Sequence, residues 1–119
     1  GEACVMSDAR RGGWTWGRLE NGVLTDVPAV LPAEQARVSV AECMGKGVPV
    51  FSTETADHLA AREMSGIVPV YPSAEALGAV WLSLAEARRE ELLESPAEPL
   101  YVRAPHITRA KRPAWAVKA

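Results

Sequence analysis

The first quarter of the chain alternates apolar and polar residues in the manner of half-buried strands. Residues 4–6 form a short apolar run, and residues 14–20 alternate so that Trp14 and Trp16 share one face. The Asn21-Gly22 pair that follows predicts a two-residue hairpin turn, because both positions tolerate positive φ. Residues 23–31 return as a third strand, in which Pro28 indicates an edge position or a bulge. The pattern predicts three antiparallel strands.

Two helices and two short strands are expected next. Pro32 and an early acidic residue favour a helix that runs to about residue 44 and ends at Gly45 or Gly47. The remaining elements are expected as a buried strand at 48–51, a shorter helix at 55–64 and a strand at 67–71.

A long final helix is predicted to begin at Ser73, which is a good capping residue, and to stop before Pro96. Its apolar residues recur at the i, i+3, i+4 and i+7 spacing of a buried helix face. We expect this buried stripe to comprise Leu77, Val80, Trp81 and Leu84. The far end of the helix is highly charged and is expected to be solvated.

The predicted order is β-β-β-α-β-α-β-α over residues 1–98, followed by an extended basic tail at 99–119. A three-strand antiparallel meander followed by β/α units is typical of an RNase H-like α/β domain with a mixed sheet. The same unit, duplicated, builds the actin and Hsp70 type of ATPase. A shared fold does not by itself assign a function.

Composition is that of one ordinary globular domain. The chain has 119 residues, of which 48% are hydrophobic and 24% charged. A chain of this length buries enough surface for one core, so disorder and a fibrous structure are not expected. No apolar run approaches the length needed to span a bilayer, so no membrane association is expected.

Charge is unevenly distributed along the chain. All fifteen acidic residues lie at or before Glu98, where eight bases accompany them and leave a net charge of −7. The five bases beyond Glu98 are Arg103, Arg109, Lys111, Arg112 and Lys118. Contact with RNA or an acidic partner is therefore possible through Arg109, Lys111 and Arg112. The alternative is a solvated tail, or one that lies on its own acidic body.

Candidate catalytic and cofactor-binding groups are few. Cys4 and Cys43 form no CxxC pair, and no signal-peptide pattern precedes them, which favours structural thiols and a cytoplasmic protein. The two histidines, His58 and His106, are expected at the surface and offer no metal-ligand spacing. Since Gly12-Gly13 lies between two strands, it does not predict a phosphate-binding loop. We expect no metal, no cofactor and no catalytic residue.

Two alternatives remain open. Several acidic residues lie near the positions at which RNase H-type nucleases hold two magnesium ions, namely Asp8, Glu34 or Glu42, Glu54 and Glu75. Of these, Asp8 and Glu54 are offset outward from the nuclease positions. Trp14 and Trp16 are aromatic groups of the kind on which RNA bases stack, with Arg10, Arg11 and Arg18 nearby. The competing interpretations are solvated acids and a sheet face packed under a helix.

Two segments resemble a known family. Residues 6–16 contain Asp8-Ala9-Arg10-Arg11-Gly12 and resemble the Asp-Ala-Arg-x-Gly-Glu segment of the bacterial TsaB (YeaZ-like, glycoprotease-like) family. Residues 97–103 resemble that family's closing Pro-x-Tyr-Leu-Arg element through Pro99, Tyr101 and Arg103. Gly13 stands where the family has Glu. In the family the first of these segments opens the second of two lobes, so the resemblance implies that this chain is a second lobe without its first.

The resemblance implies an accessory protein that is not itself an enzyme. TsaB-type proteins are silent relatives of TsaD, the transferase that modifies the adenosine beside the anticodon of tRNA with a threonylcarbamoyl group. The expected partners are a TsaD-like subunit and an ATPase subunit, with tRNA contacted indirectly and a homodimer possible. The first turn is then expected to be shaped by Asp8, Ala9, Arg10 and Gly12. The chain is expected to be fixed, where it returns toward the other lobe, by Pro99, Tyr101 and Arg103. The historical peptidase label finds no support in the sequence.

Overall fold

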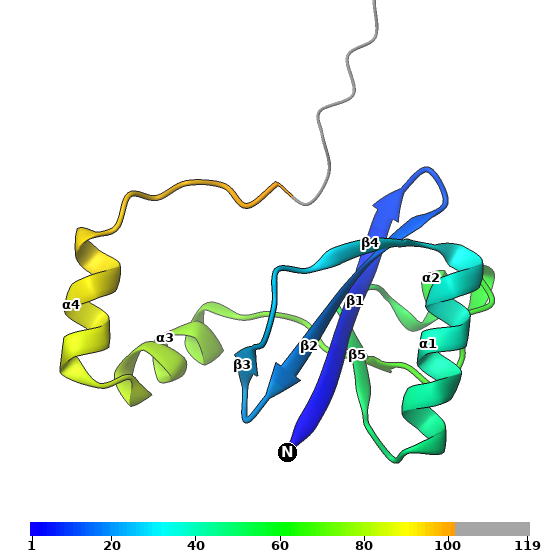
Figure 1. The fold of residues 1–119 in the computed structure, drawn as a ribbon, viewed down its shortest axis with the longest axis horizontal. Helices are drawn as coiled ribbons and strands as arrows, with labels where there is room; N and C mark the ends of the chain where they lie inside the picture. Colours follow the sequence, from blue (N-terminus) through cyan, green and yellow to red (C-terminus); the bar gives the residue numbers. More distant parts are fainter. Residues whose placement is uncertain (102–119) are drawn as a thin grey trace, which may run out of the picture.

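The computed structural model describes residues 1–101, which form a mixed α/β fold around one six-stranded sheet (Figure 1). The strands are β1 (Glu2–Arg10), β2 (Gly13–Glu20), β3 (Val23–Leu24), β4 (Ala29–Pro32), β5 (Val50–Ser52) and β6 (Val68–Pro69). The sheet order is β3-β2-β1-β5-β6, and β4 pairs with β2. β1, β5 and β6 run parallel, whereas β2 is antiparallel to β1, β3 and β4. The expected mixed sheet is confirmed.

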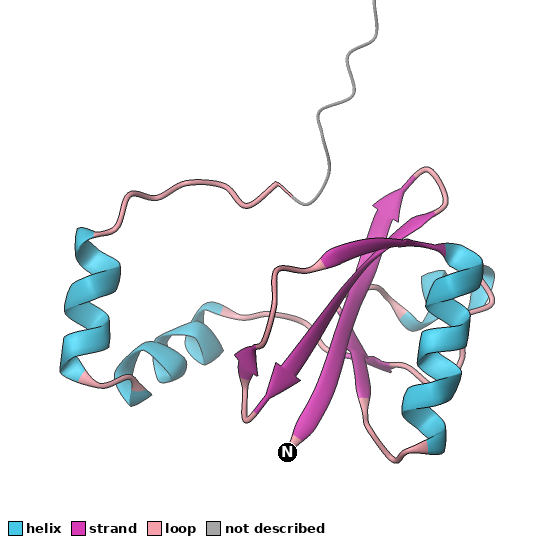
Figure 2. Cartoon of the chain, viewed as in Figure 1, coloured by secondary structure: helices cyan, strands magenta, loops and turns pink. Residues whose placement is uncertain are grey.

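Four helices follow or interrupt these strands (Figure 2). They are α1 (Ala33–Gly45), α2 (Ala56–Ala61), α3 (Ala74–Ser83) and α4 (Glu86–Glu94). The observed order is therefore β-β-β-β-α-β-α-β-α-α, which differs from the expected order by one additional strand and one additional helix. None of the helices within residues 1–101 is long and apolar enough to cross a membrane.

The hydrophobic core lies between one face of the sheet and helices α1 and α2. Its buried members are Cys4, Met6, Trp14, Ala36, Val40, Val50, Leu59 and Met64. Trp14 is only 3% exposed, and Trp16 packs against the same cluster. The packing interpretation is confirmed for Trp14, because a tryptophan this buried offers no face on which a base can stack, whereas Trp16 is half-buried at the edge of the cluster.

The expected third strand is divided into β3 and β4. Leu24 pairs with Leu19 and Ala29 pairs with Trp16, so four residues of the returning chain lie opposite only two residues of β2. The two extra residues leave the sheet between the pairs, in the segment that ends at Pro28. A proline cannot donate to the ladder, which is why the interruption occurs there.

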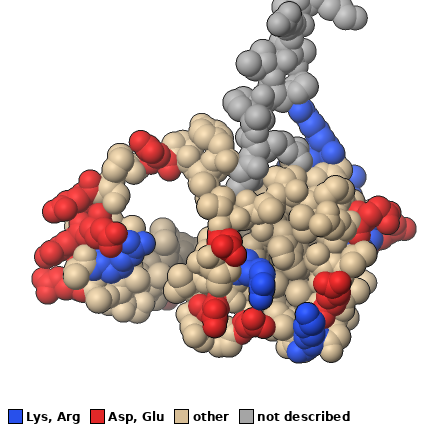
Figure 3. All heavy atoms as spheres, viewed as in Figure 1, with Lys and Arg blue, Asp and Glu red and all other residues tan. Residues whose placement is uncertain are grey.

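The final helix is also divided, and the expected burial of its stripe is wrong. Leu84 and Ala85 adopt extended backbone between α3 and α4. Leu77 is 72% exposed and Val80 57% exposed, and neither helix buries any residue. Figure 1 shows α3 and α4 apart from the layer that contains α1 and α2, and Figure 3 shows acidic side chains gathered over α4. The amphipathic pattern is real, but the sheet does not cover it.

Most of the predicted turns and helix starts are confirmed. Asn21 and Gly22 have φ values of 52° and 81°, as a two-residue hairpin turn requires. α1 begins directly after Pro32, and the Ser73 hydroxyl accepts a hydrogen bond from the Ala76 amide at the start of α3. The Thr55 hydroxyl caps α2 in the same way, although α2 ends several residues before its expected limit.

Candidate functional site

The residues of the first family-like segment form the tight turn between β1 and β2. Arg10, Arg11 and Gly12 have positive φ values of 67°, 53° and 73°. The pairing of β1 with β2 shifts by one residue between Asp8 and Arg10, which marks a bulge. The Asp8 carboxylate accepts a hydrogen bond of 2.7 Å from the Arg10 amide across this bulge. Asp8 therefore fixes the backbone of the turn.

Asp8 is also held by residues from β5 and α2. His58 Nε2 lies 2.8 Å from Asp8 Oδ2, and the Asp8 amide donates to Glu54 Oε1 at 3.0 Å. The Asp8 side chain is 7% exposed and the His58 side chain 26% exposed. His58 is therefore only partly at the surface, because its ring covers Asp8 and lies 6.3 Å from the Trp14 ring centre.

The electrostatics at Asp8 favour its ionised form. Burial by itself would raise the pKa of the carboxyl group. The Arg10 amide and the His58 side chain donate hydrogen bonds to it, and the charges of Arg10 and His58 act in the same direction. These contacts outweigh burial, and the pKa of Asp8 falls below its ordinary value of 3.8. A carboxylate held in this way is suited to orienting a turn, and poorly suited to donating a proton.

A cavity of about 310 Å³ opens beside this turn, and we call it the arginine pocket. It is lined by Asp8, Arg10, Arg11, Gly12, Trp14, Ala33, Arg37 and Arg62. The four arginines come from the turn, from α1 and from the end of α2. The Ala33 amide donates to the Gly12 carbonyl oxygen at 3.0 Å, so the first turn of α1 lies against the β1–β2 turn. The sequence did not indicate this contact, because Gly12 and Ala33 are twenty-one residues apart.

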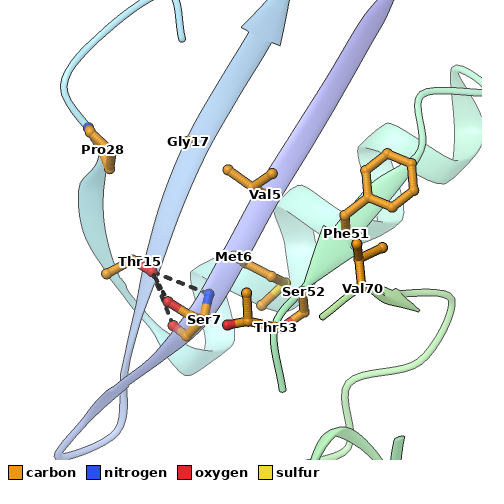
Figure 4. A pocket seen from close by; sticks show the side chains of 10 residues that line it. All are labelled: Val5, Met6, Ser7, Thr15, Gly17, Pro28, Phe51, Ser52, Thr53 and Val70. Atoms are coloured by element: carbon orange, nitrogen blue, oxygen red, sulfur yellow. Dashed lines mark hydrogen bonds between the residues drawn. The ribbon is translucent and has the colours of Figure 1, made fainter. Parts of the chain in front are cut away.

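A second hollow lies on the opposite face of the sheet, which α1 and α2 leave uncovered. Its volume is about 400 Å³ (Figure 4). It is lined by Val5, Met6, Ser7, Thr15, Gly17, Pro28, Phe51, Ser52, Thr53 and Val70. We call this surface the open sheet face. Val5 pairs with Gly17 on one side and with Phe51 on the other, so its apolar centre spans three strands.

Gly17 allows close packing at the edge of this hollow. A Cβ atom at this position would lie 3.1 Å from both Val5 Cγ2 and Leu24 Cδ2, so the neighbouring side chains close around the bare backbone. At one end, the hydroxyls of Ser7 and Thr15 are 2.6 Å apart and satisfy each other (Figure 4). The open sheet face is therefore a concave, largely apolar surface, with few polar groups that are not already hydrogen-bonded.

The two thiols behave as packing groups. Cys4 is buried, and its Sγ lies 3.6 Å from Cys43 Sγ. Burial, together with the hydrogen bond and charge interaction with Cys43, raises the pKa of Cys4 to about 11. A thiol with such a pKa is almost wholly protonated near neutral pH and is a poor nucleophile.

The acidic residues considered for a nuclease site do not assemble into a metal site. Asp8 and Glu54 are neighbours, whereas Glu34 is exposed and pairs with Arg37. Glu42 lines a different cavity, beside Cys4 and Arg18, and Glu75 lies in α3. Within residues 1–101, no group of three His, Cys, Asp or Glu side chains is placed to hold a metal ion.

The closing family-like segment is only partly described. Pro99 and Tyr101 have no regular secondary structure, and Tyr101 is 76% exposed. The described residues do not include Arg103, His106, Arg109, Lys111 and Arg112. The structure therefore brings together Asp8, Ala9, Arg10 and Gly12, but it does not test the predicted contacts of the tail.

Comparisons of the chain with protein-family models, with curated proteins and with solved structures found no match.

Proposed function

We propose that this chain is the RNase H-like second lobe of a non-catalytic accessory protein for threonylcarbamoyl modification of tRNA. In this role it stabilises or positions a TsaD-like transferase, which works with an ATPase subunit on the adenosine next to the anticodon. The chain supplies protein contact and no reactive group. The cytoplasm is the compartment in which this role is expected.

The link to tRNA modification rests on the resemblance of residues 6–16 and 97–103 to TsaB-type proteins. The sheet supports the RNase H-like part of the proposal, because β1 is central, β2 is antiparallel to it, and β5 and β6 follow it in parallel. The turn motif supports it as well, since Asp8 orders Arg10 through a direct hydrogen bond.

The accessory part of the proposal is carried by the open sheet face. Val5 and Phe51 lie at its centre, and Val70 at its margin is 46% exposed. Contiguous apolar surface of this kind marks a protein contact site in a soluble domain. The exposed apolar residues of α3 provide a second surface of the same chemistry. In the proposed protein these surfaces meet the first lobe or the transferase.

The direct test is co-purification of the tagged protein with a TsaD-like transferase from the same cells. We expect stable capture by the wild-type protein and clear loss of capture by Val70→Asp, which places a charge on the open sheet face. Val38→Asp is the matched control, because Val38 is 57% exposed on α1, on the covered side of the sheet. No capture of the transferase by the wild-type protein, or equal capture by both variants, would contradict the proposal.

The two alternative functions give different results in assays of the chain alone. A nuclease would cleave RNA in a magnesium-dependent reaction that Asp8→Asn abolishes. An RNA-binding module would bind RNA with an affinity that falls steeply with salt and with removal of residues 109–118, because phosphate contacts release counterions. The accessory role predicts neither result.

A further inference from the structure

We infer that Cys4 and Cys43 form a reversible disulfide when the chain meets a peroxide, and that this bond joins the end of α1 to the central strand of the sheet. The chain has two cysteines in all, and both are free thiols. This inference goes beyond the proposed function and does not depend on it. It concerns the side of the sheet that α1 covers, whereas the proposed function uses the open sheet face.

The fold brings the two thiols together from distant parts of the chain. Cys4 lies on β1, and Cys43 lies 39 positions later in the last turn of α1. Their sulfur atoms are 3.6 Å apart. Bonded sulfur atoms are about 2.05 Å apart, so the two atoms need to approach by about 1.5 Å.

The end of α1 leaves room for this approach. Cys43 is followed by Gly45 and Gly47, and a Cβ atom added at either glycine would meet nothing within 4 Å. Met44 is 56% exposed, so this turn of the helix lies at the surface. Cys4, in contrast, pairs with residues of β2 on one side and of β5 on the other. A small shift of the helix end toward β1 therefore closes the bond while the sheet stays in place.

The two thiols differ in their access to solvent. Cys4 is 4% exposed, whereas Cys43 is half-buried. Both line a cavity of about 200 Å³, together with Arg18 and Lys46. Hydrogen peroxide is a neutral molecule little larger than water, and a cavity of this size admits it. Cys43 is thus the thiol that a peroxide reaches, and Cys4 is the partner beside it.

The oxidation proceeds in two steps that balance. The Cys43 thiolate attacks one oxygen of hydrogen peroxide, the O–O bond breaks, and the departing hydroxide takes up a proton to become water. Cys43 is then a sulfenic acid. The Cys4 sulfur attacks the Cys43 sulfur, the S–O bond breaks, and the hydroxyl group leaves as a second water with the Cys4 proton. Two thiols lose two electrons, and one peroxide gains them.

The buried position of Cys4 agrees with its role in the second step. Cys4 attacks a sulfur of the same folded chain that already lies beside it, so it needs no contact with solvent. A reduced dithiol or glutathione reverses the reaction by thiol–disulfide exchange. Reversible disulfides of this kind in reducing compartments typically act as redox sensors.

The test treats the native wild-type chain with hydrogen peroxide and measures the mass of the intact chain and of its peptides. We expect a mass lower by two hydrogen atoms, with the Cys4 and Cys43 peptides joined, and full reversal by dithiothreitol. Oxidation of the exposed Met44 adds an oxygen atom and is distinguished by mass. Cys43→Ala should lose no hydrogen atoms. Cys4→Ala should accumulate the Cys43 sulfenic acid, which dimedone labels.

Equilibration with oxidised and reduced dithiothreitol gives a second measurement that needs no variant. The equilibrium constant for the disulfide should be at least about tenfold higher in the native chain than in urea, because the fold holds the two thiols together. The oxidised chain should accordingly melt at a higher temperature than the reduced chain.

The inference is wrong if peroxide leaves both thiols free in the native chain, or if it joins two chains in place of the internal pair. It is also wrong if the equilibrium constant in the native chain is no higher than in urea, which is the result expected of thiols that only pack together. Capture of the transferase is measured separately on the reduced chain, so each proposal can fail alone.

Discussion

The His58 imidazole from α2 lies 2.8 Å from the carboxylate of Asp8 on β1, although fifty residues separate them in the sequence. This contact ties the second helix to the turn between the first two strands. The same carboxylate holds the Arg10 amide, so a single side chain connects the helix layer to the turn that carries the family-like residues.

Asp8 is expected to make stability depend on acid pH. Above about pH 5 the carboxylate is ionised in both the folded and the unfolded chain, so its full contribution is present. Because its pKa is lower in the folded protein than the ordinary 3.8, the unfolded chain binds the proton first as the pH falls, and stability decreases. Urea unfolding at pH 7 and pH 3 should show that Asp8→Asn costs about 1–2 kcal/mol at pH 7 and less at pH 3.

Asp26→Asn provides the comparison for this experiment, because Asp26 is exposed in the segment between β3 and β4. Its effect on the free energy of unfolding should be within about 0.5 kcal/mol. An equal loss in both variants, or a loss for Asp8→Asn that grows as the pH falls, would show that Asp8 does not act through its ionised form.

Arg11 is expected to reduce stability through its backbone conformation. It has a φ of 53°, in the left-handed region that a long side chain adopts at an energetic cost. Asparagine enters this region more easily, so Arg11→Asn should raise the free energy of unfolding by about 0.5 kcal/mol. Thermal and urea unfolding measure this change.

Two leucines distinguish the covered helices from the exposed ones. Leu59 in α2 is 3% exposed, whereas Leu82 in α3 is 74% exposed. Leu59→Ala should cost about 2–5 kcal/mol of unfolding free energy, because it leaves a cavity in the core. Leu82→Ala should cost less than about 0.5 kcal/mol in the isolated chain. A large loss for Leu82→Ala would mean that α3 packs against the sheet in solution.

Cys4 should be unreactive while the protein is folded. With a pKa raised to about 11, only roughly one thiol in a thousand is ionised at pH 8. Iodoacetamide at pH 8 should therefore leave Cys4 unmodified in the native chain and alkylate it in urea, as peptide mass spectrometry would detect. Rapid native alkylation of Cys4 would contradict the proposed packing role of this thiol.

Local signals were sufficient to predict much of the fold. The Asn21-Gly22 turn, the start of α1 after Pro32 and the Ser73 cap all depend on residues that are close in sequence. The alternation at residues 14–16 placed Trp14 and Trp16 on the same buried face for the same reason. The predicted elements are accurate where the backbone conformation is set by neighbours within a few residues.

The remaining features depend on contacts that no local pattern encodes. The pairing of His58 with Asp8 and the approach of Ala33 to Gly12 join distant segments, so the arginine pocket was not predicted. Helical spacing identified the apolar stripe of α3 but could not reveal that the sheet leaves it uncovered. No Gly or Pro marks the break between α3 and α4 after Ser83. The Ser83 hydroxyl donates a hydrogen bond to the Val80 carbonyl oxygen and so competes with the backbone hydrogen bonds of the helix.

In its proposed role, this protein supports tRNA modification through protein contact. The most direct measurement is the amount of threonylcarbamoyladenosine in tRNA, determined by nucleoside mass spectrometry in cells that carry wild-type protein, no protein, Val70→Asp or Val38→Asp. We expect a marked decrease without the protein, rescue by the wild-type and Val38→Asp forms, and poor rescue by Val70→Asp. Unchanged threonylcarbamoyladenosine in cells that lack the protein would contradict it.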